Sequence, residues 1–425
     1  MNRTITPHIK DAVEFNLLLK PLQRFTLDNG VEVYAIDAGA EEVLQIDWLF
    51  YAGNWHEDEN LVAASTNHLL KNGTFKRTAY NINEHFDYYG SYLNRHCYNE
   101  TATLTLHCLN KHLPELLPVM QEILTESVFY EEELQLFKQT SKQKLEVNLK
   151  KCEFVANRLI DNYLYGSDHP YGKHSSSAAF DALTREQLQE FYHRYYLHGK
   201  CIIFVAGKLP HNTLALLNQY FGNHPLNQQQ SDGKLHPVQA AAEKKFRISN
   251  DPDGVQGAIR IASYCPARKD PEFLKIQVLN NLFGGYFGSR LMSNIREDKG
   301  YTYGIHSYLQ NHVQQSAWMI STEAGRAVSE ETIEEVYNEM KDLREEPVDE
   351  EELLLVRNHM IGTILGELDG PFHIMAKWKN IVLHDLGEQY FYDSINTIKS
   401  VSANELQELA NKYLVPEHFY ELIVV

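Results

Sequence analysis

Arg296 and Tyr303 have side chains that could act together on one oxygen atom of a substrate. The two residues are seven positions apart, within residues 283–307. An arginine guanidinium is a rigid fork of N–H donors, and a tyrosine phenol donates one hydrogen bond. Two such donors aimed at a developing oxyanion would stabilise its negative charge. The alternative interpretation is an arginine that solvates the end of a helix and a tyrosine that is merely part of a strand.

A helix, a tight turn and a strand must position these two donors. The spacing of apolar residues predicts a short helix over about 287–298. Lys299 and Gly300 are typical of a helix end, because glycine readily takes the left-handed conformation that follows the last turn. An alternating strand is predicted over 301–305. The guanidinium is therefore expected at the end of the helix and the phenol early in the strand.

Composition excludes some classes of partner. The chain has 425 residues with 39 basic and 57 acidic side chains, so its formal net charge is −18. This excess of acid argues against nucleic acid and anionic membranes as partners. Five scattered cysteines without a Cys-x-x-Cys spacing predict free buried thiols. The N-terminus has no apolar run of signal-peptide length, so we expect no export signal and no membrane span. A cytoplasmic location is the default expectation, and a periplasmic one stays open if the chain was trimmed.

The chain contains an internal repeat. Residues 183–207 align without a gap with residues 401–425, and Leu188 falls on Leu406. Such self-similarity predicts a duplicated α+β domain. We expect a first domain over 1–225, a polar, Gln-rich linker over 226–244 and a second domain over 245–425.

Two long helical patterns precede the repeated unit 183–207 in the first half. One is predicted over about 111–127, and another continues without a break over about 130–165.

A zinc site would need more than the histidines of this chain provide. Two histidines at i and i+4 on a helix can hold zinc, and a neighbouring acid can serve as the base for water. The helix predicted over 61–72 has only His68, with Ala64 four residues before it and Asn67 adjacent. A single imidazole on a helix is usually packed or solvated. The residues alone therefore indicate a two-domain α+β protein that is not a metalloenzyme by itself.

Several short motifs along the chain point to the same protein family. TLDNGVEVYA, YAGNWHE, LLKNGT and HPYG occur in this order, followed by FGGYFGSRL and IREDKGYTYG within 283–304. Together they resemble the pitrilysin/insulinase family of zinc peptidases in its short, two-domain bacterial form, over residues 25–425. The resemblance implies two homologous domains, each a mostly antiparallel sheet packed with helices. It also implies that Arg296 and Tyr303 close over the substrate carbonyl at a zinc ion held elsewhere.

The inverted zinc motif of this family, His-x-x-Glu-His, falls on residues 64–68. Ala64 replaces the first ligand, Asn67 replaces the catalytic base, and only His68 matches. Glu146 is either the distal ligand displaced by one position or a solvated acid on a helix. Two ligands at best fall short of the three that catalytic zinc sites use, and no carboxylate is present to take a proton from water. We therefore expect this chain to bind no metal.

The resemblance also suggests how such a chain could function. Some family members are heterodimers in which one subunit holds zinc and the other supplies the arginine and tyrosine. We expect a subunit that is inactive alone and joins a homologous zinc-binding partner in an active endopeptidase, with a peptide as substrate. Asn94, Gly284 and Gly285 are the expected substrate contacts, although Arg95 replaces the usual small residue and the glycines could simply break a helix.

Two other functions stay open at this point. The chain could be a pseudo-peptidase that acts as a structural scaffold, or a peptide-binding module without any role in catalysis. The isolated chain could also form a homodimer. A scaffold does not need Arg296 and Tyr303, whereas a half of an enzyme does.

Overall fold

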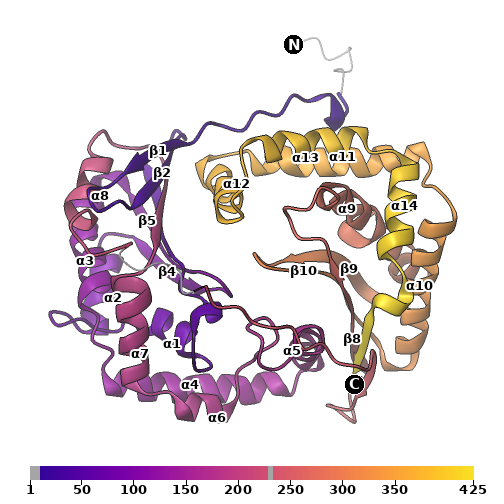
Figure 1. The fold of residues 1–425 in the computed structure, drawn as a ribbon, viewed down its shortest axis with the longest axis horizontal. Coiled ribbons are helices and arrows are strands. Elements are labelled where there is room, and N and C mark those ends of the chain that lie inside the picture. The colour runs from indigo at the N-terminus through magenta and orange to yellow at the C-terminus, as the bar shows by residue number, and fades with distance from the viewer. Residues whose placement is uncertain (1–9, 228–232) are drawn as a thin grey trace.

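Two sheets, one from each half of the chain, form the framework of the molecule (Figure 1). The computed structural model describes residues 10–227 and 233–425. The first sheet has the strand order β1-β2-β6-β3-β5-β4, and the second has the order β7-β11-β8-β10-β9. The strands are β1 Gln23–Thr26, β2 Glu32–Asp37, β3 Val43–Phe50, β4 Tyr92–Cys97, β5 Ala102–Leu109, β6 Cys201–Gly207, β7 Lys245–Ile248, β8 Gln256–Cys265, β9 Thr302–Asn311, β10 Ser316–Gly325 and β11 Tyr420–Val424.

Apart from β1, the two sheets have the same topology. β2 pairs parallel with β6, as β7 does with β11, and every other pair in both sheets is antiparallel. The edge strands β4 and β9 occupy equivalent places. The predicted α+β fold of two similar, mostly antiparallel halves is therefore confirmed. The domain limits stay a prediction, because part of the proposed linker, residues 228–232, lies outside the described residues.

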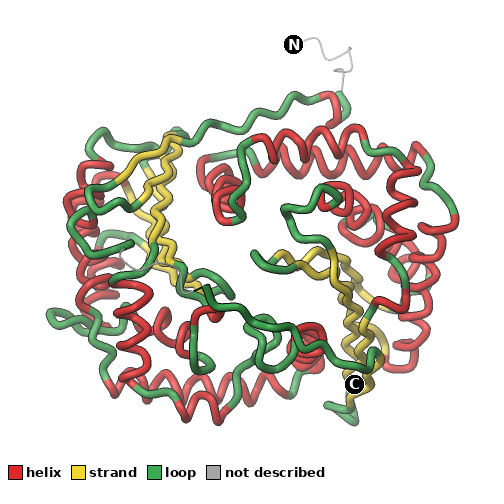
Figure 2. Tube along the Cα trace, viewed as in Figure 1, coloured by secondary structure: helices red, strands yellow, loops and turns green. Residues whose placement is uncertain are grey.

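Helices flank both sheets, as the colours of Figure 2 show. They are α1 Val62–Leu69, α2 Ala79–Tyr88, α3 Leu113–Glu126, α4 Glu131–Leu149, α5 Cys152–Tyr165, α6 Ser177–Ala182, α7 Arg185–Tyr192, α8 Thr213–Phe221, α9 Phe273–Asn280, α10 Ser329–Glu345, α11 Glu350–Glu367, α12 Pro371–Leu383, α13 Gln389–Ser400 and α14 Ala403–Tyr413. Thr184 and Ser402 form capping boxes with Gln187 and Glu405 at the starts of α7 and α14. These matching N-termini belong to the predicted repeat. Throughout the described ranges, no helix combines the length and hydrophobicity that a bilayer crossing requires.

Each half contributes one helix to the sheet of the other half (Figure 1). α5 belongs to the first half by sequence but packs on β8 and β11, where Ile160 and Leu164 share a buried cluster with Leu422. In the opposite direction, α12 packs on β2 and β6 of the first sheet, with Trp378 buried in the same cluster as Phe204. Because apolar surface of both sheets is covered by the other half, we conclude that the halves are one structural unit.

The prediction of one continuous helix over 130–165 is wrong. The structure has two helices, α4 and α5, separated at Lys150 and Lys151. Lys151 is extended, with φ −94° and ψ 122°, so the chain changes direction there. Apolar periodicity continues across the break because both helices bury a face, but α4 packs on α6 whereas α5 packs on β8 and β11. The change of direction carries α5 onto the second sheet.

The helix predicted over 287–298 is shorter than expected. It begins at Arg290 and continues as a π-helix, Met292–Asp298. Tyr286 is extended, with φ −151° and ψ 174°, which separates this helix from the preceding π-helix Asn281–Gly285. Gly300 has φ +66°, the left-handed conformation expected after the last turn.

Candidate functional site

Arg296 lies in the last turn of the π-helix Met292–Asp298, as the sequence predicted. Its guanidinium carbon is 4.6 Å from the centroid of the Phe287 ring, a cation–π contact. Its Nη1 atom is 3.6 Å from Oε1 of Glu297, and the side chain is 33% exposed. The guanidinium is therefore supported on one side by an aromatic ring and open to solvent on another.

Tyr303 projects from an irregular point of the edge strand β9. Tyr303 and Gly304 together stand opposite one residue of β10, Glu323, so β9 has a β-bulge here. The amide of Gly304 donates to Oγ1 of Thr302 at 3.1 Å, and this hydroxyl donates to the carbonyl oxygen of Glu323 at 2.7 Å. The Tyr303 side chain is 91% exposed. The bulge therefore holds the backbone of Tyr303 in place and leaves its phenol accessible to a ligand or a partner.

Arg296 and Tyr303 are close in sequence and lie on adjoining elements, since the π-helix Met292–Asp298 contacts β9. The described part of the chain has no hydrogen bond between them. Both side chains are accessible, so an oxyanion presented by another molecule could receive donors from each.

Other residues of the protein, rather than an open space for a ligand, lie against the backbone of Gly284. A Cβ atom at this position would lie 2.7 Å from Cβ of Ser307 and 2.8 Å from Cδ1 of Leu291. At Gly285 a Cβ atom would lie 3.1 Å from Nδ2 of Asn281. Gly284 therefore lets the helix pack against β9, whereas the atoms nearest to Gly285 belong to the preceding turn of its own helix.

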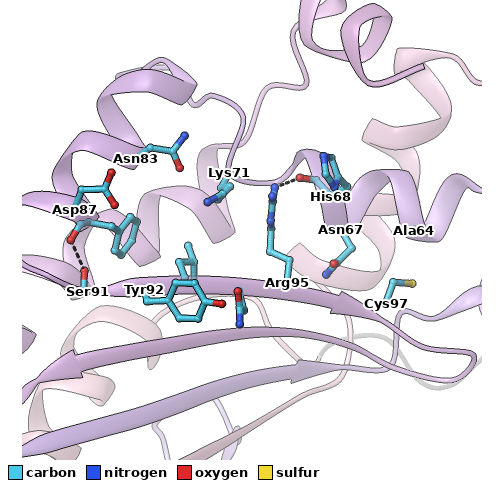
Figure 3. Close-up of a pocket in the computed structure, with 13 residues that line it drawn as sticks. Ala64, Asn67, His68, Lys71, Asn83, Asp87, Ser91, Tyr92, Arg95 and Cys97 are labelled. Atoms are coloured by element: carbon cyan, nitrogen blue, oxygen red, sulfur yellow. Dashed lines mark hydrogen bonds between the residues drawn. The ribbon is translucent and has the colours of Figure 1, made fainter. Parts of the chain in front are cut away.

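A pocket of about 460 Å³ opens between α1, α2 and the edge strand β4 (Figure 3). It brings together four of the residues singled out from the sequence, namely Ala64, Asn67, His68 and Asn94. Its full lining is Ala64, Asn67, His68, Lys71, Asn83, Phe86, Asp87, Ser91, Tyr92, Leu93, Asn94, Arg95 and Cys97.

Asn67 lines the pocket, but its side chain is hydrogen-bonded within the protein core. Its side chain is 2% exposed, and its Nδ2 atom donates to the phenol oxygen of Tyr196 at 3.2 Å. Tyr196 is itself buried beside Phe50. Asn67 is thus already used to satisfy a buried phenol.

Arg95 reaches across the pocket from β4 to α1. Its Nη1 atom donates to the main-chain carbonyl oxygen of His68, as Figure 3 shows, and to Oδ1 of Asn72 at 3.2 Å. Burial lowers the pKa of the Arg95 guanidinium to about 10, which leaves it cationic at neutral pH. Lys71 lines the same pocket, and burial followed by the charge of Arg95 lowers the pKa of its ammonium group.

His68 is neutral in this environment. Burial first, and then the charges of Arg95, Lys144 and Lys71, lower the pKa of its imidazole to about 4. The ring lies against Phe137 of α4, with the two centroids 4.7 Å apart.

Two family models match the chain. Residues 42–169 match Insulinase (Peptidase family M16), and residues 182–360 match the Peptidase M16 inactive domain. The chain belongs to the M16 peptidase family. The pitrilysin/insulinase resemblance inferred from the motifs is thereby confirmed. The match to the model described as inactive extends from α7 in the first half to α11 in the second.

Individual proteins are similar to this chain over nearly its whole length. An uncharacterized zinc protease, YmxG of Bacillus subtilis, is 22% identical over 410 residues, which cover 95% of this chain and 98% of that protein. The crystal structure of a peptidase M16 inactive domain from Pseudomonas fluorescens superposes with a TM-score of 0.85 at 21% identity, covering 95% of this chain and 98% of the other. A chain of complex III2 from Candida albicans superposes with a TM-score of 0.76 at 14% identity, covering 95% and 96%.

The residues at the M16 zinc motif do not fit a zinc ion. Ala64 has no donor atom, Asn67 is bonded to Tyr196, and His68 is the one imidazole in the pocket lining. Arg95 and Lys71 place positive charge where a cation would have to bind. In residues 10–227 and 233–425, no group of three or more His, Cys, Asp or Glu side chains is arranged to hold a metal.

Glu146 is not part of this pocket. It is exposed on α4 and lines a different surface depression, together with Lys142 and Asp181. The preceding residue, Leu145, is the one that is buried. Glu146 therefore faces away from His68. This agrees with the alternative interpretation, a solvated acid on a helix.

Among the pocket residues that the sequence did not single out is the cationic Lys71, and Arg95 was noted only as a departure from the family pattern. Two signals could have found them. Lys71 lies three residues after His68, so both point to one side of the helix region. Arg95 alternates with Leu93 and Cys97 along β4, which places all three on the sheet face toward α1.

Proposed function

We propose that this chain is the zinc-free subunit of a two-chain M16 peptidase and that it supplies Arg296 and Tyr303 to the active site of a homologous partner. The observation that carries the proposal is the contrast between its two candidate sites. The pocket at the zinc motif contains Arg95 and Lys71 in place of a ligand set. In the other half, Arg296 is partly exposed and Tyr303 is almost fully exposed, and local structure holds both residues.

The two donors have complementary properties. Arg296 offers a permanent positive charge, and its ring contact with Phe287 restricts the guanidinium without using its N–H groups. Tyr303 offers a neutral O–H donor on a bulge that is pinned by Thr302. When a peptide carbonyl becomes tetrahedral, both side chains donate hydrogen bonds to its oxyanion. A zinc ion bound by the partner subunit would provide the chemistry that activates the attacking water.

The edge of the second sheet suits an extended peptide. β9 is the last strand of its sheet, so one side of its backbone has no strand partner among the described residues. An extended peptide can pair with such an edge. This would bring a peptide carbonyl alongside Tyr303.

Reconstitution tests the proposal. The chain is mixed with a homologous M16 subunit from the same cells that has an intact His-x-x-Glu-His motif, and hydrolysis of a quenched-fluorescent peptide is followed. Arg296→Ala and Tyr303→Phe should each lower kcat by roughly 10²–10³-fold, the usual loss for an oxyanion donor. Tyr308→Phe is the matched control, because it removes an exposed phenol further along the same strand, opposite Met319. Unchanged activity in both variants would sink the proposal.

The second candidate function is that of a scaffold without a catalytic role. It is favoured by the similarity of the fold to a chain of complex III2. In this case removal of the whole chain would disrupt an assembly, whereas Arg296→Ala and Tyr303→Phe would leave the assembly and its activity intact. Mass measurement of the isolated chain would show whether it forms a homodimer when the partner is absent.

A further inference from the structure

We propose that the pocket between α1, α2 and β4 is a carboxylate-binding site, in which Lys71 and Arg95 bind a carboxylate group of a peptide. This inference concerns the first half of the chain and is independent of the role proposed for Arg296 and Tyr303. It starts from the finding that the pocket at the M16 zinc motif contains two cationic side chains.

The charges lining the pocket favour an anion. Lys71 and Arg95 are cationic, Asp87 is the one carboxylate in the lining, and His68 is neutral at pH 7. Burial, followed by the charge of Arg95, lowers the pKa of Lys71, and the charge of Asp87 offsets part of this lowering. In the described ranges, however, neither Lys71 nor Arg95 forms an ion pair within 4 Å. This local excess of positive charge stands against a net charge of −18 for the whole chain.

Arg95 is arranged to receive a carboxylate. Its Nη1 atom is held by the carbonyl oxygen of His68 and by Asn72. In the part of the chain that the structure describes, Nε and Nη2 have no acceptor. These two N–H groups form the planar fork that fits the two oxygens of a carboxylate. A guanidinium that is fixed in advance and left unpaired in a partly buried pocket gains by binding an anion.

The surroundings indicate that the carboxylate belongs to a peptide. The pocket has about 460 Å³, which is more than a carboxylate needs, and Asn83, Asn94 and Ser91 add amide and hydroxyl groups. Arg95 lies on β4, whose other edge has no strand partner in the described chain. A peptide backbone could therefore lie along β4 while its carboxylate reaches Arg95 and Lys71.

Calorimetric titration of the full chain with three acetylated pentapeptides tests the site. The first is pentaalanine with a free C-terminal carboxylate, the second is its C-terminal amide, and the third is the amide with Glu at the fourth position. We expect at least one of the two carboxylate peptides to bind about tenfold more tightly than the plain amide. Preference for the first identifies the C-terminal carboxylate, and preference for the third identifies an acidic side chain. Equal affinity for all three would overturn the proposal.

Variants assign the binding to the pocket. Lys71→Gln and Arg95→Gln should each remove most of the tenfold preference, and Arg95→Lys should keep part of it because the charge remains while the fork is lost. Arg24→Gln removes an exposed arginine from β1, the opposite edge of the same sheet, and should leave the preference intact. Thermal unfolding of each variant verifies that it folds. If Arg95→Gln does not fold, Lys71→Gln alone assigns the binding to the pocket. A preference that survives Lys71→Gln and Arg95→Lys unchanged would also overturn the proposal.

Discussion

Arg95 donates a hydrogen bond from Nη1 to the main-chain carbonyl oxygen of His68, so a strand residue of the first sheet is fastened to the last turn of α1. This contact joins β4 to the helix on which M16 peptidases have their zinc motif. It keeps a guanidinium beside the one histidine that remains of the motif. Together with Lys71, this guanidinium supplies the local positive charge from which we inferred a carboxylate-binding site.

The purified chain should contain far less than one zinc ion per molecule. Zinc needs three protein ligands in a catalytic site, whereas this pocket offers one imidazole and two cations. Elemental analysis after dialysis measures the metal content. Added zinc should also leave Tm unchanged, because only a ligand that binds the folded state raises it. Stoichiometric zinc that a chelator removes, with a fall in Tm, would contradict the account of Ala64, Asn67 and Arg95.

Thr302→Val should lower the activity of a reconstituted peptidase through Tyr303. The valine keeps the shape of the side chain but loses the hydroxyl that links Gly304 to Glu323, so the bulge no longer fixes the phenol. We expect kcat to fall by about tenfold with KM unchanged, since misplaced catalytic groups cost rate more than binding. Thr302→Ser should restore kcat. Equal rates for Thr302→Val and the unmodified chain would show that the bulge does not position Tyr303.

Asp161→Asn should stabilise the protein above neutral pH. Asp161 lies on α5, accepts a hydrogen bond from Gln310 at 3.3 Å, and burial raises the pKa of its carboxyl to about 7. Since the folded pKa exceeds the ordinary value near 4, the unfolded chain loses this proton first. Stability therefore falls as pH rises from about 4 to 7 and then stays level.

Urea unfolding at pH 5 and pH 8 measures this effect. Asp161→Asn should raise the free energy of unfolding at pH 8 by roughly 1–3 kcal/mol, and by less at pH 5. Asp181→Asn is the control, because Asp181 is exposed and pairs with Lys142. A variant that is less stable than the parent chain at both pH values would refute the assignment to Asp161.

Trp378→Ala should destabilise both halves together. Trp378 lies on α12, is 6% exposed and donates from Nε1 to the carbonyl oxygen of Lys20 at 2.9 Å. Removing a buried tryptophan costs about 3–5 kcal/mol. Because α5 and α12 are exchanged between the halves, urea unfolding followed by tryptophan fluorescence and by circular dichroism should show one coincident transition at a lower midpoint. Trp378→Phe should lower the free energy of unfolding by less than Trp378→Ala does. Two separate transitions would mean that the exchanged helices do not couple the halves.

Local features of the fold could be read from the sequence. The repeat of 183–207 in 401–425 indicated two similar α+β halves, and the sheets have matching strand orders. Gly300 was expected in the left-handed conformation and has φ +66°. The residues that cap α7 and α14, Thr184 and Ser402, occupy equivalent positions of this repeat. Such features depend on neighbours within a few positions, and the sequence displays these directly.

Only the tertiary structure separated α4 from α5, because the reason for the break at Lys151 is a sheet formed by residues more than 100 positions away. It also brought Lys71 and Arg95 to one pocket and removed Glu146 from it. Single residues of these types are common on protein surfaces, and their meaning depends on which groups lie within a few ångströms. The sequence by itself determined the family, the duplication and the loss of the zinc ligands. The fold decided what replaced them, since charge and burial at a site come from contacts between distant segments.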